Sequence, residues 1–412
     1  MRKLYVFVGL ILCAVMPFYA VAQSQNEKKE KKKKEHKEVN PNFKHKFTTF
    51  HLEARADFEY DGTLYLYKGN YSEPPYYQPK WNHRYGFRGD YFNFKLGGDI
   101  GEHITYFLCQ RIVPTAGSTN FFDNTDFLYI QYNFNKQWSL RMGKEAISMG
   151  GFEYDAAPID VYYNTHYWGS FPCFLLGMSA SYTDKSGKNK IVFNVANSPY
   201  VKYMDNNWNS GLLSYNLYWH GKFGHFSTAY SVNFMEYQRG KFINFIVLGN
   251  KLSFDKWSIY ADYINRAAGF RNFFQDFSVV SRLDWHVSPS VNLFAKGGYE
   301  QNFSGYTYQA DDGDFAQTAA AQTRDWDPIS VDMLMPDGYN HWFYGLGLEF
   351  RPRVYPDLRV HAWVADMVMH RPGSIAEIYP SITDAERHTI SANVGVTWKL
   401  DFMKLLPEKL KN

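Results

Sequence analysis

Apolar and polar residues alternate along the last regular segment of the chain, residues 388–402. Every second side chain of a strand points to the same face, so a period of two separates the two kinds of residue. An aromatic residue near the end of such a strand suits the boundary between lipid and water. The pattern therefore predicts a strand with one face for lipid and one for water. Its apolar face comprises Ile390, Ala392, Val394, Val396, Trp398, Leu400 and Phe402.

The same alternation returns in residues 47–60, where the polar face carries Glu53, Arg55 and Asp57. So many ionisable residues on one face cannot form a dry core, because burying an unpaired charge is costly. Turn residues bound fourteen further segments of this kind. The sixteen predicted strands are residues 47–60, 84–96, 103–113, 124–134, 137–145, 173–183, 189–197, 210–219, 225–236, 241–253, 256–264, 273–287, 290–300, 339–351, 357–369 and 388–402.

The connections between these segments alternate between short and long. Residues 135–136 form one of the short connections, and residues 301–338 form the longest. Outer-membrane barrels have short periplasmic turns and long external loops, and an even number of strands places both termini in the periplasm. Sixteen strands leave an aqueous channel, whereas about eight fill with side chains. We predict an all-β fold, a transmembrane antiparallel barrel of about sixteen strands over residues 47–402.

The first residues have the pattern of an export signal. Arg2 and Lys3 precede an apolar run, and small residues at positions 20 and 22 match a cleavage site before Gln23. We expect residues 1–22 to be a signal peptide. A lipid anchor at Cys13 is the weaker alternative, because a leucine precedes that cysteine. Residues 23–46 are expected to form a Lys/Glu-rich periplasmic tail, and residues 403–412 a short C-terminal tail.

Composition and charge agree with a barrel and argue against nucleic acid as a partner. Aromatic residues make up 19% of the chain, yet the mean hydropathy is only −0.44. The formal net charge is +3, but residues 2–3 contribute +2 and residues 27–38 contribute another +3, which leaves −2 for the remainder. The positive charge belongs to the N-terminal end. A soluble β-sandwich is an alternative, but its inward faces would have to form a dry core.

Strand parity predicts which charged residues face the lumen. Both signs are present, an arrangement that favours small polar solutes over apolar ones. For each residue, an ion pair that only stabilises the wet interior is the alternative interpretation. The predicted lining residues are Glu53, Arg55, Asp57, Arg111, Arg141, Asp276, Arg282, Asp284, Lys296, Glu349, Arg351 and Arg359.

Candidate metal and catalytic motifs are weak. The 13 histidines are scattered without a ligand spacing, and the aspartates near residue 312 lack the spacing of a calcium loop. Cys109 and Cys173 have no metal or redox spacing. Ser278 and His286 would lie about 26 Å apart on one strand, too far for proton transfer. We therefore expect no cofactor, no metal site and no catalytic site.

Residues 138–152, WSLRMGKEAISMGGF, continue through Glu153, Asp155 and Asp160. This stretch resembles Bacteroidetes outer-membrane porins of the phosphate-selective porin O and P family. The resemblance implies a sixteen-strand channel, commonly a homotrimer, whose third external loop folds inward to narrow the pore. By position that loop is residues 146–172, with Glu153, Asp155 and Asp160 at the constriction. The family's anion selectivity rests on Lys and Arg, and this loop has neither.

These observations predict an outer-membrane porin for passive diffusion of small hydrophilic solutes, with anions such as phosphate implied by the resemblance. The expected partners are outer-membrane lipid, lipopolysaccharide and the solutes themselves. An adhesin or an envelope-complex scaffold built on a barrel is the alternative, because residues 301–338 would form a long external loop. A barrel hydrolase is a further alternative, but no local motif supports it.

Overall fold

The computed structural model describes residues 47–69, 81–112, 121–170, 173–199, 211–267, 273–274, 276–302, 339–371 and 385–405. By internal contacts the chain forms two units, Met1–His45 and Lys46–Asn412, and every described residue belongs to the second. The predicted signal peptide and Lys/Glu-rich tail, residues 1–46, lie outside the described residues, as do residues 303–338 of the predicted external loop. Among the described residues, no helix has the length and apolar character needed to cross a membrane.

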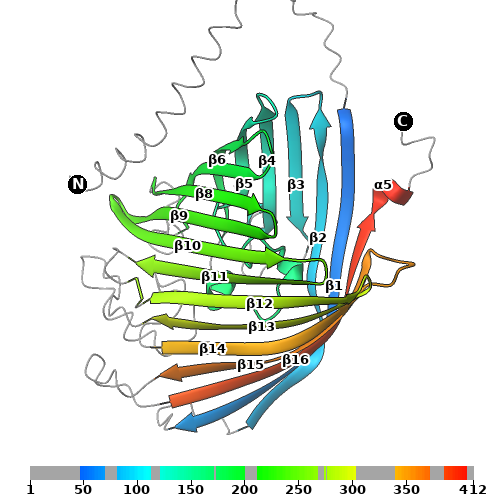
Figure 1. Ribbon diagram of the computed structural model, residues 1–412, viewed down its shortest axis with the longest axis vertical. Helices are drawn as coiled ribbons and strands as arrows, with labels where there is room; N and C mark the ends of the chain where they lie inside the picture. The colour runs from blue at the N-terminus through cyan, green and yellow to red at the C-terminus, as the bar shows by residue number, and fades with distance from the viewer. Residues whose placement is uncertain are drawn as a thin grey trace, which may run out of the picture. The chain divides into compact units, whose positions relative to one another are not determined.

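The described strands form one closed antiparallel barrel (Figure 1). Each strand pairs with its neighbours in sequence, and β1 closes the sheet on β16. The predicted all-β barrel of sixteen strands is confirmed. The strands are β1 Phe47–Gly69, β2 Trp81–Ile100, β3 Ile104–Arg111, β4 Thr125–Asn133, β5 Trp138–Ala146, β6 Phe174–Thr183, β7 Asn189–Asn197, β8 Leu213–Phe223, β9 Phe226–Gln238, β10 Lys241–Ser253, β11 Trp257–Ala267, β12 Asp276–Ser288, β13 Val291–Asn302, β14 Tyr339–Phe350, β15 Leu358–Arg371 and β16 Ala385–Asp401.

The outer face of the barrel is apolar and the inner face is polar, as the alternation requires. On β1, Phe58 and Tyr60 are 62% and 42% exposed, whereas Glu53 and Asp57 are each only 3% exposed. Closure gives every strand a hydrogen-bonded neighbour on both sides, which is the condition for a sheet to lie in lipid. The outer face is therefore suited to lipid and the inner face to water.

β1 and β2 are longer than predicted. The sequence pattern ends the first strand at residue 60, because the Asp61-Gly62 pair is typical of a turn. In the structure Asp61 lies opposite Asn393 of β16, and the Asn393 amide donates a hydrogen bond of 2.7 Å to the Asp61 carboxylate. The neighbouring strand carries the pairing on to Gly69, so long-range pairing overrides the local turn signal.

The connection from β5 to β6 lies inside the barrel. We call its described residues 147–170 the inner loop; it contains the short helices η2, Pro158–Asp160, and α2, His166–Ser170. Two apolar clusters join it to lumen-facing side chains of the wall. In one, Ile147 and Met149 pack with Phe245 of β10. In the other, Tyr162 stacks on Phe294 of β13 with ring centroids 5.1 Å apart. The principal core is therefore formed between the loop and one side of the wall.

Two further short helices complete the described structure. Helix η1, Phe121–Asn124, precedes β4, and helix α5, Phe402–Leu405, follows β16. Phe402 was predicted to end the last strand, but β16 ends one residue earlier, at Asp401. The Asp401 carboxylate accepts a hydrogen bond of 3.0 Å from the Met403 backbone N–H. The chain therefore turns into α5 directly after the strand.

Candidate functional site

Backbone hydrogen bonds hold the first part of the inner loop on β9 and β11. The Gly150 N–H donates to the Ser231 hydroxyl at 2.8 Å, and the Glu153 N–H donates to the Asp262 carboxylate at 2.8 Å. A Cβ at Gly150 would lie 2.4 Å from the Ala229 carbonyl oxygen. A side chain at residue 150 would therefore keep the loop from its observed position. Glycine allows this close approach.

A buried ion pair anchors the middle of the inner loop to β13. The Lys296 ammonium lies 2.6 Å from a Glu153 carboxylate oxygen, and neither side chain is more than 3% exposed. The Thr165 hydroxyl donates to the other Glu153 oxygen at 2.7 Å, and Lys296 also donates to the Tyr162 carbonyl at 2.9 Å. These hydrogen bonds offset the desolvation of the two charges. Glu153 therefore fastens the loop and does not face the open lumen.

The turn of η2 is held by the side chain of Arg359 from β15. Its guanidinium pairs with the Asp160 carboxylate and donates to the Ile159 carbonyl and the Thr397 hydroxyl. Arg282 of β12 approaches the Asp160 carbonyl at 3.5 Å. The Asp160 carboxylate is therefore neutralised by an ion pair with the barrel wall.

Most of the remaining predicted lining residues form ion pairs at three places on the wall. Asp284 and Glu349 lie 2.8 Å and 3.3 Å from Arg282, beneath the inner loop, and Arg351 lies 3.2 Å from Glu349 in the turn after β14. Asp276 pairs with Arg266, and both side chains are almost inaccessible. Glu53 accepts from Arg55 at 2.6 Å and from Lys399 at 3.0 Å, while Asp57, four residues further along β1, is also buried.

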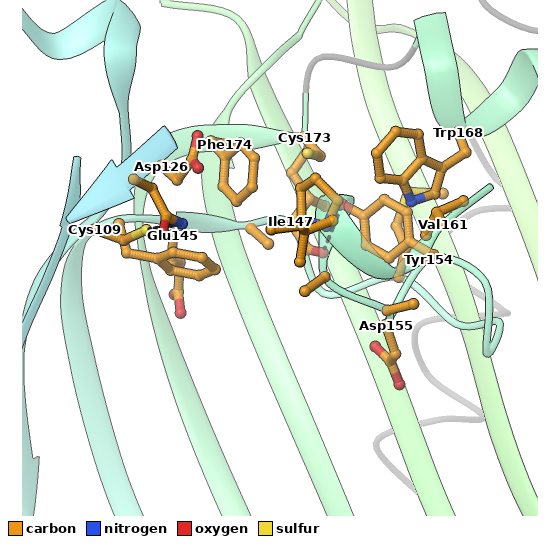
Figure 2. Close-up of a pocket in the computed structure, with 18 of the residues that line it drawn as sticks. Cys109, Asp126, Glu145, Ile147, Tyr154, Asp155, Val161, Trp168, Cys173 and Phe174 are labelled. Atoms are coloured by element: carbon orange, nitrogen blue, oxygen red, sulfur yellow. Dashed lines mark hydrogen bonds between the residues drawn. The ribbon is translucent and has the colours of Figure 1, made fainter. Parts of the chain in front are cut away.

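A cavity of 1280 Å³ lies between the inner loop and the wall formed by β1 to β8, with part of β15. Figure 2 shows part of it, with Asp155 and Trp168 of the inner loop on one side and Asp126 and Phe174 of the wall on the other. Seven basic residues and four acidic residues line it. They are Arg55, Arg88, Lys95, Arg111, Arg141, Lys144 and Lys190, and Glu59, Asp126, Glu145 and Asp155.

Four of the predicted site residues line this cavity: Arg55, Arg111, Arg141 and Asp155. The structure adds others that the sequence reasoning missed. Lys95 and Lys190 could have been predicted from the sequence, because each lies on the same face of its strand as the inward-facing residues. Asp126 could not, because the register between β3 and β4 shifts next to Cys109 and breaks the period of two. The transport roles of all these residues stay predictions.

Two arginines lie across the cavity wall over aromatic rings. The Arg141 guanidinium is 4.1 Å from the centroid of the Tyr129 ring and also pairs with Glu145 at 2.8 Å. The Arg111 guanidinium is 5.4 Å from the centroid of the Tyr91 ring and pairs with Asp126 at 2.9 Å. Ring faces attract a cation and restrict its motion, so both guanidinium groups are held in place on the wall.

Asp155 is the acidic residue of the inner loop that lines the cavity. Its carboxylate accepts a hydrogen bond of 3.0 Å from the Tyr218 hydroxyl. The Asp155 side chain is accessible from the cavity, but protein surrounds it within the barrel. This desolvation raises the pKa of Asp155 to about 6, against the opposing effect of the Tyr218 hydrogen bond. The loop can therefore change its charge near neutral pH.

Residues 69–198 match the family model described as Phosphate-selective porin O and P. The matched stretch runs from the end of β1 past β7 and includes the inner loop. A comparison with curated proteins gives no match.

Several solved structures are similar to this chain. The outer membrane channel DcaP of Acinetobacter baumannii is 10% identical with a TM-score of 0.48, and the match covers 84% of this chain and 97% of that chain. OmpT of Vibrio cholerae is 9% identical with a TM-score of 0.48, covering 85% and 98%. OprB of Pseudomonas putida is 13% identical with a TM-score of 0.47, covering 85% and 94%.

Proposed function

We propose that this chain is an outer-membrane porin through which small hydrophilic solutes, and anions in particular, diffuse passively. The observation that carries this proposal is the cavity between the inner loop and the wall, lined by seven basic and four acidic residues. A barrel of sixteen strands is wide enough to hold water. Passive diffusion requires no catalytic group.

The outer surface supports placement in a membrane. Large apolar side chains are exposed around the barrel, such as Phe87 on β2 at 90% and Trp285 on β12 at 52%. In water an exposed apolar surface of this kind promotes aggregation, whereas in lipid apolar side chains are favoured on the outer face of a barrel. The signal-like first residues support export to the outer membrane, with both termini in the periplasm.

The distribution of charge supports a preference for anions. Glu153 and Asp160 of the inner loop are neutralised by Lys296 and Arg359, so their charges do not dominate the open part of the lumen. Lys190 on β7 has no ion pair among the described residues, and its side chain is exposed to the cavity. An excess of fixed positive charge raises the local concentration of anions.

The resemblance supports the same class of solute. The stretch Trp138–Phe152, which resembles the Bacteroidetes porins, lies within the residues that match the phosphate-selective family. Phosphate is therefore the anion that we propose first. The homotrimer that the resemblance implies is also a proposal, as are contacts with lipopolysaccharide at the external loops.

A planar lipid bilayer tests this function directly. Purified protein should give stepwise currents, and in a salt gradient the reversal potential should have the sign expected for an anion-selective channel. Added phosphate should reduce the chloride current. The absence of stepwise current would contradict the channel itself, whereas a cation-type reversal potential would contradict only the anion preference.

A further inference from the structure

Two imidazoles and one carboxylate meet where the inner loop contacts the wall. His166 begins α2, Glu300 lies near the end of β13, and His341 lies on β14. One potential ligand atom from each residue lies within 4.8 Å of the other two. The two imidazole rings are 4.6 Å apart between centroids, with their planes at 76°. These three residues form a compact set of nitrogen and oxygen donors.

We propose that His166, Glu300 and His341 bind one divalent transition-metal ion of the Zn²⁺ type, which ties the inner loop to the barrel wall. Zn²⁺ binds imidazole nitrogen and carboxylate oxygen at about 2.0–2.2 Å, and two histidines with one glutamate make a known three-ligand set. Two ligands at that distance in a tetrahedral site are about 3.4 Å apart. The present donor atoms lie within 4.8 Å of one another, so metal binding requires the side chains to approach by at most about 1.4 Å.

The burial and charge of Glu300 are the second observation in favour of a metal. Its side chain is 1% exposed, and among the described residues no lysine or arginine lies within ion-pair distance of it. Its only ion-pair partner there is His341, at 2.9 Å. A buried carboxylate needs a compensating charge. A divalent cation held by Glu300 and the two neutral imidazoles would supply it.

Neighbouring donors already orient the carboxylate. The Ser278 hydroxyl donates to one Glu300 oxygen, and the His166 backbone N–H donates to the other at 3.0 Å. Such contacts fix the direction of a ligand and are typical of metal sites. Lys296, the nearest cation on β13, is compensated by Glu153 at 2.6 Å and so opposes a bound cation only weakly.

A second cluster of this kind, Asp57, Glu59 and His361, is less suitable. The Arg88 guanidinium lies 2.8 Å from Glu59 and already supplies the positive charge. A metal ion there would face that guanidinium at close range. In the cluster at His166, no arginine or lysine of the described residues lies within ion-pair distance of Glu300.

No sequence pattern could have revealed the proposed site. His166 and Glu300 are separated by 134 positions and Glu300 and His341 by 41, whereas metal motifs are recognised by short fixed spacings. Only the inward course of the loop brings the three residues together. The expectation of no metal site followed from the absence of such spacings.

Isothermal titration of the chelator-treated protein in detergent with Zn²⁺ tests this proposal. We expect one Zn²⁺ per chain. His166→Ala and His341→Ala should each weaken Zn²⁺ binding by at least roughly 10-fold. Ser278→Ala removes a hydrogen bond to the proposed ligand Glu300 but no ligand atom, and should weaken binding by about 10-fold. His286→Ala is the matched control, because His286 is exposed and far along β12 from Ser278. It should leave Zn²⁺ binding unchanged.

The outcomes separate the proposal from a folding defect and from the proposed function. Because Glu300 is buried, Glu300→Gln could prevent folding and is not used. His166→Ala changes a half-buried ring on the loop and leaves the sheet intact. Co²⁺ should show the intense visible absorption of a tetrahedral site, lost in His166→Ala. The proposal is overturned if the unmodified protein binds no Zn²⁺, or if His166→Ala and His341→Ala bind it as tightly as His286→Ala. Neither result depends on channel activity.

Discussion

Glu153 and Asp155 are two residues apart in the inner loop and have opposite environments. Glu153 is buried against Lys296, whereas Asp155 lines the cavity and its carboxylate accepts a hydrogen bond from the neutral Tyr218 hydroxyl. The sequence alone treats them as equivalent acids at the constriction. Their difference arises from partners that lie 143 and 63 positions away, which no local pattern can reveal.

Anion preference should decrease as pH rises from about 5 to about 8. Below its pKa of about 6 the Asp155 carboxyl is neutral, and above it the loop gains one negative charge in the cavity. Reversal potentials measured across this pH range should therefore shift toward cations. In Asp155→Asn, the part of this pH-dependent change in reversal potential that comes from the loop should be absent.

Two control variants make the pH measurement specific. Asp184 lies in the turn after β6, where hydrogen bonds from Asn189 and Ser186 hold its pKa at about 2, so Asp184→Asn should change nothing in this range. His220 also lines the cavity and gains positive charge as pH falls. His220→Gln isolates the Asp155 contribution, and an unchanged slope in Asp155→Asn would contradict the assignment.

Removing one member of the buried pair should release the inner loop. Glu153→Gln leaves the Lys296 ammonium buried without its partner, at a cost of about 3–5 kcal/mol. We expect a larger single-channel conductance with more frequent fluctuations. The double variant Glu153→Gln with Lys296→Met removes both charges and should recover much of the original behaviour. Equal conductance in the single variant and the unmodified protein would exclude an anchoring role.

At the scale of elements, the inner loop depends on how closely its backbone approaches β9. In Gly150→Ala the new methyl group would meet the Ala229 carbonyl oxygen at 2.4 Å, and strand backbone cannot move away without breaking ladder hydrogen bonds. The overpacking should cost about 1–3 kcal/mol and displace the loop. Gly86→Ala is the matched control, because a Cβ there has no neighbour within 4 Å. Single-channel conductance should rise only in Gly150→Ala.

The elements themselves were largely predictable because their signal is local. The alternation in residues 388–402 depends only on neighbouring residues, and β16 is found there, extended to begin at Ala385. The failures lie where long-range pairing decides the outcome. Examples are the extension of β1 beyond Asp61 and the register shift that turns Asp126 inward.

At the scale of the whole molecule, the lumen charges are divided between the two sides of the barrel. Arg282 and Arg359 on β12 and β15 hold the inner loop, whereas several charges on β1 to β7, such as Arg141 and Lys190, line the cavity. The sequence could predict that both sets face inward, because parity is local. It could not predict which set meets open water, since that depends on where the loop docks.

Lys190→Gln should reduce the preference for anions without disturbing the fold. A unit charge about 6 Å from a passing ion in water contributes about 0.7 kcal/mol, or about a 3-fold change in permeability ratio. Lys185→Gln, in the exposed turn after β6, is the matched control and should have no effect. The difference between the two variants should shrink from about 0.1 M to about 1 M salt, because the Debye length falls from about 10 to about 3 Å. A salt-independent difference would contradict an electrostatic origin.

The docking of the inner loop on β8 to β15 also determines where the barrel can be redesigned. Substitutions on that side must preserve the hydrogen bonds and ion pairs that fix the loop, so few replacements are compatible with the fold. On β2 to β7, lumen-facing side chains line the cavity and pair with one another or with β1, as Lys95 does with Glu53 at 3.7 Å, and none of those described holds the loop by an ion pair. New solute preferences can therefore be engineered by changing residues such as Lys95 and Lys190, while the opposite side serves as an unchanged scaffold.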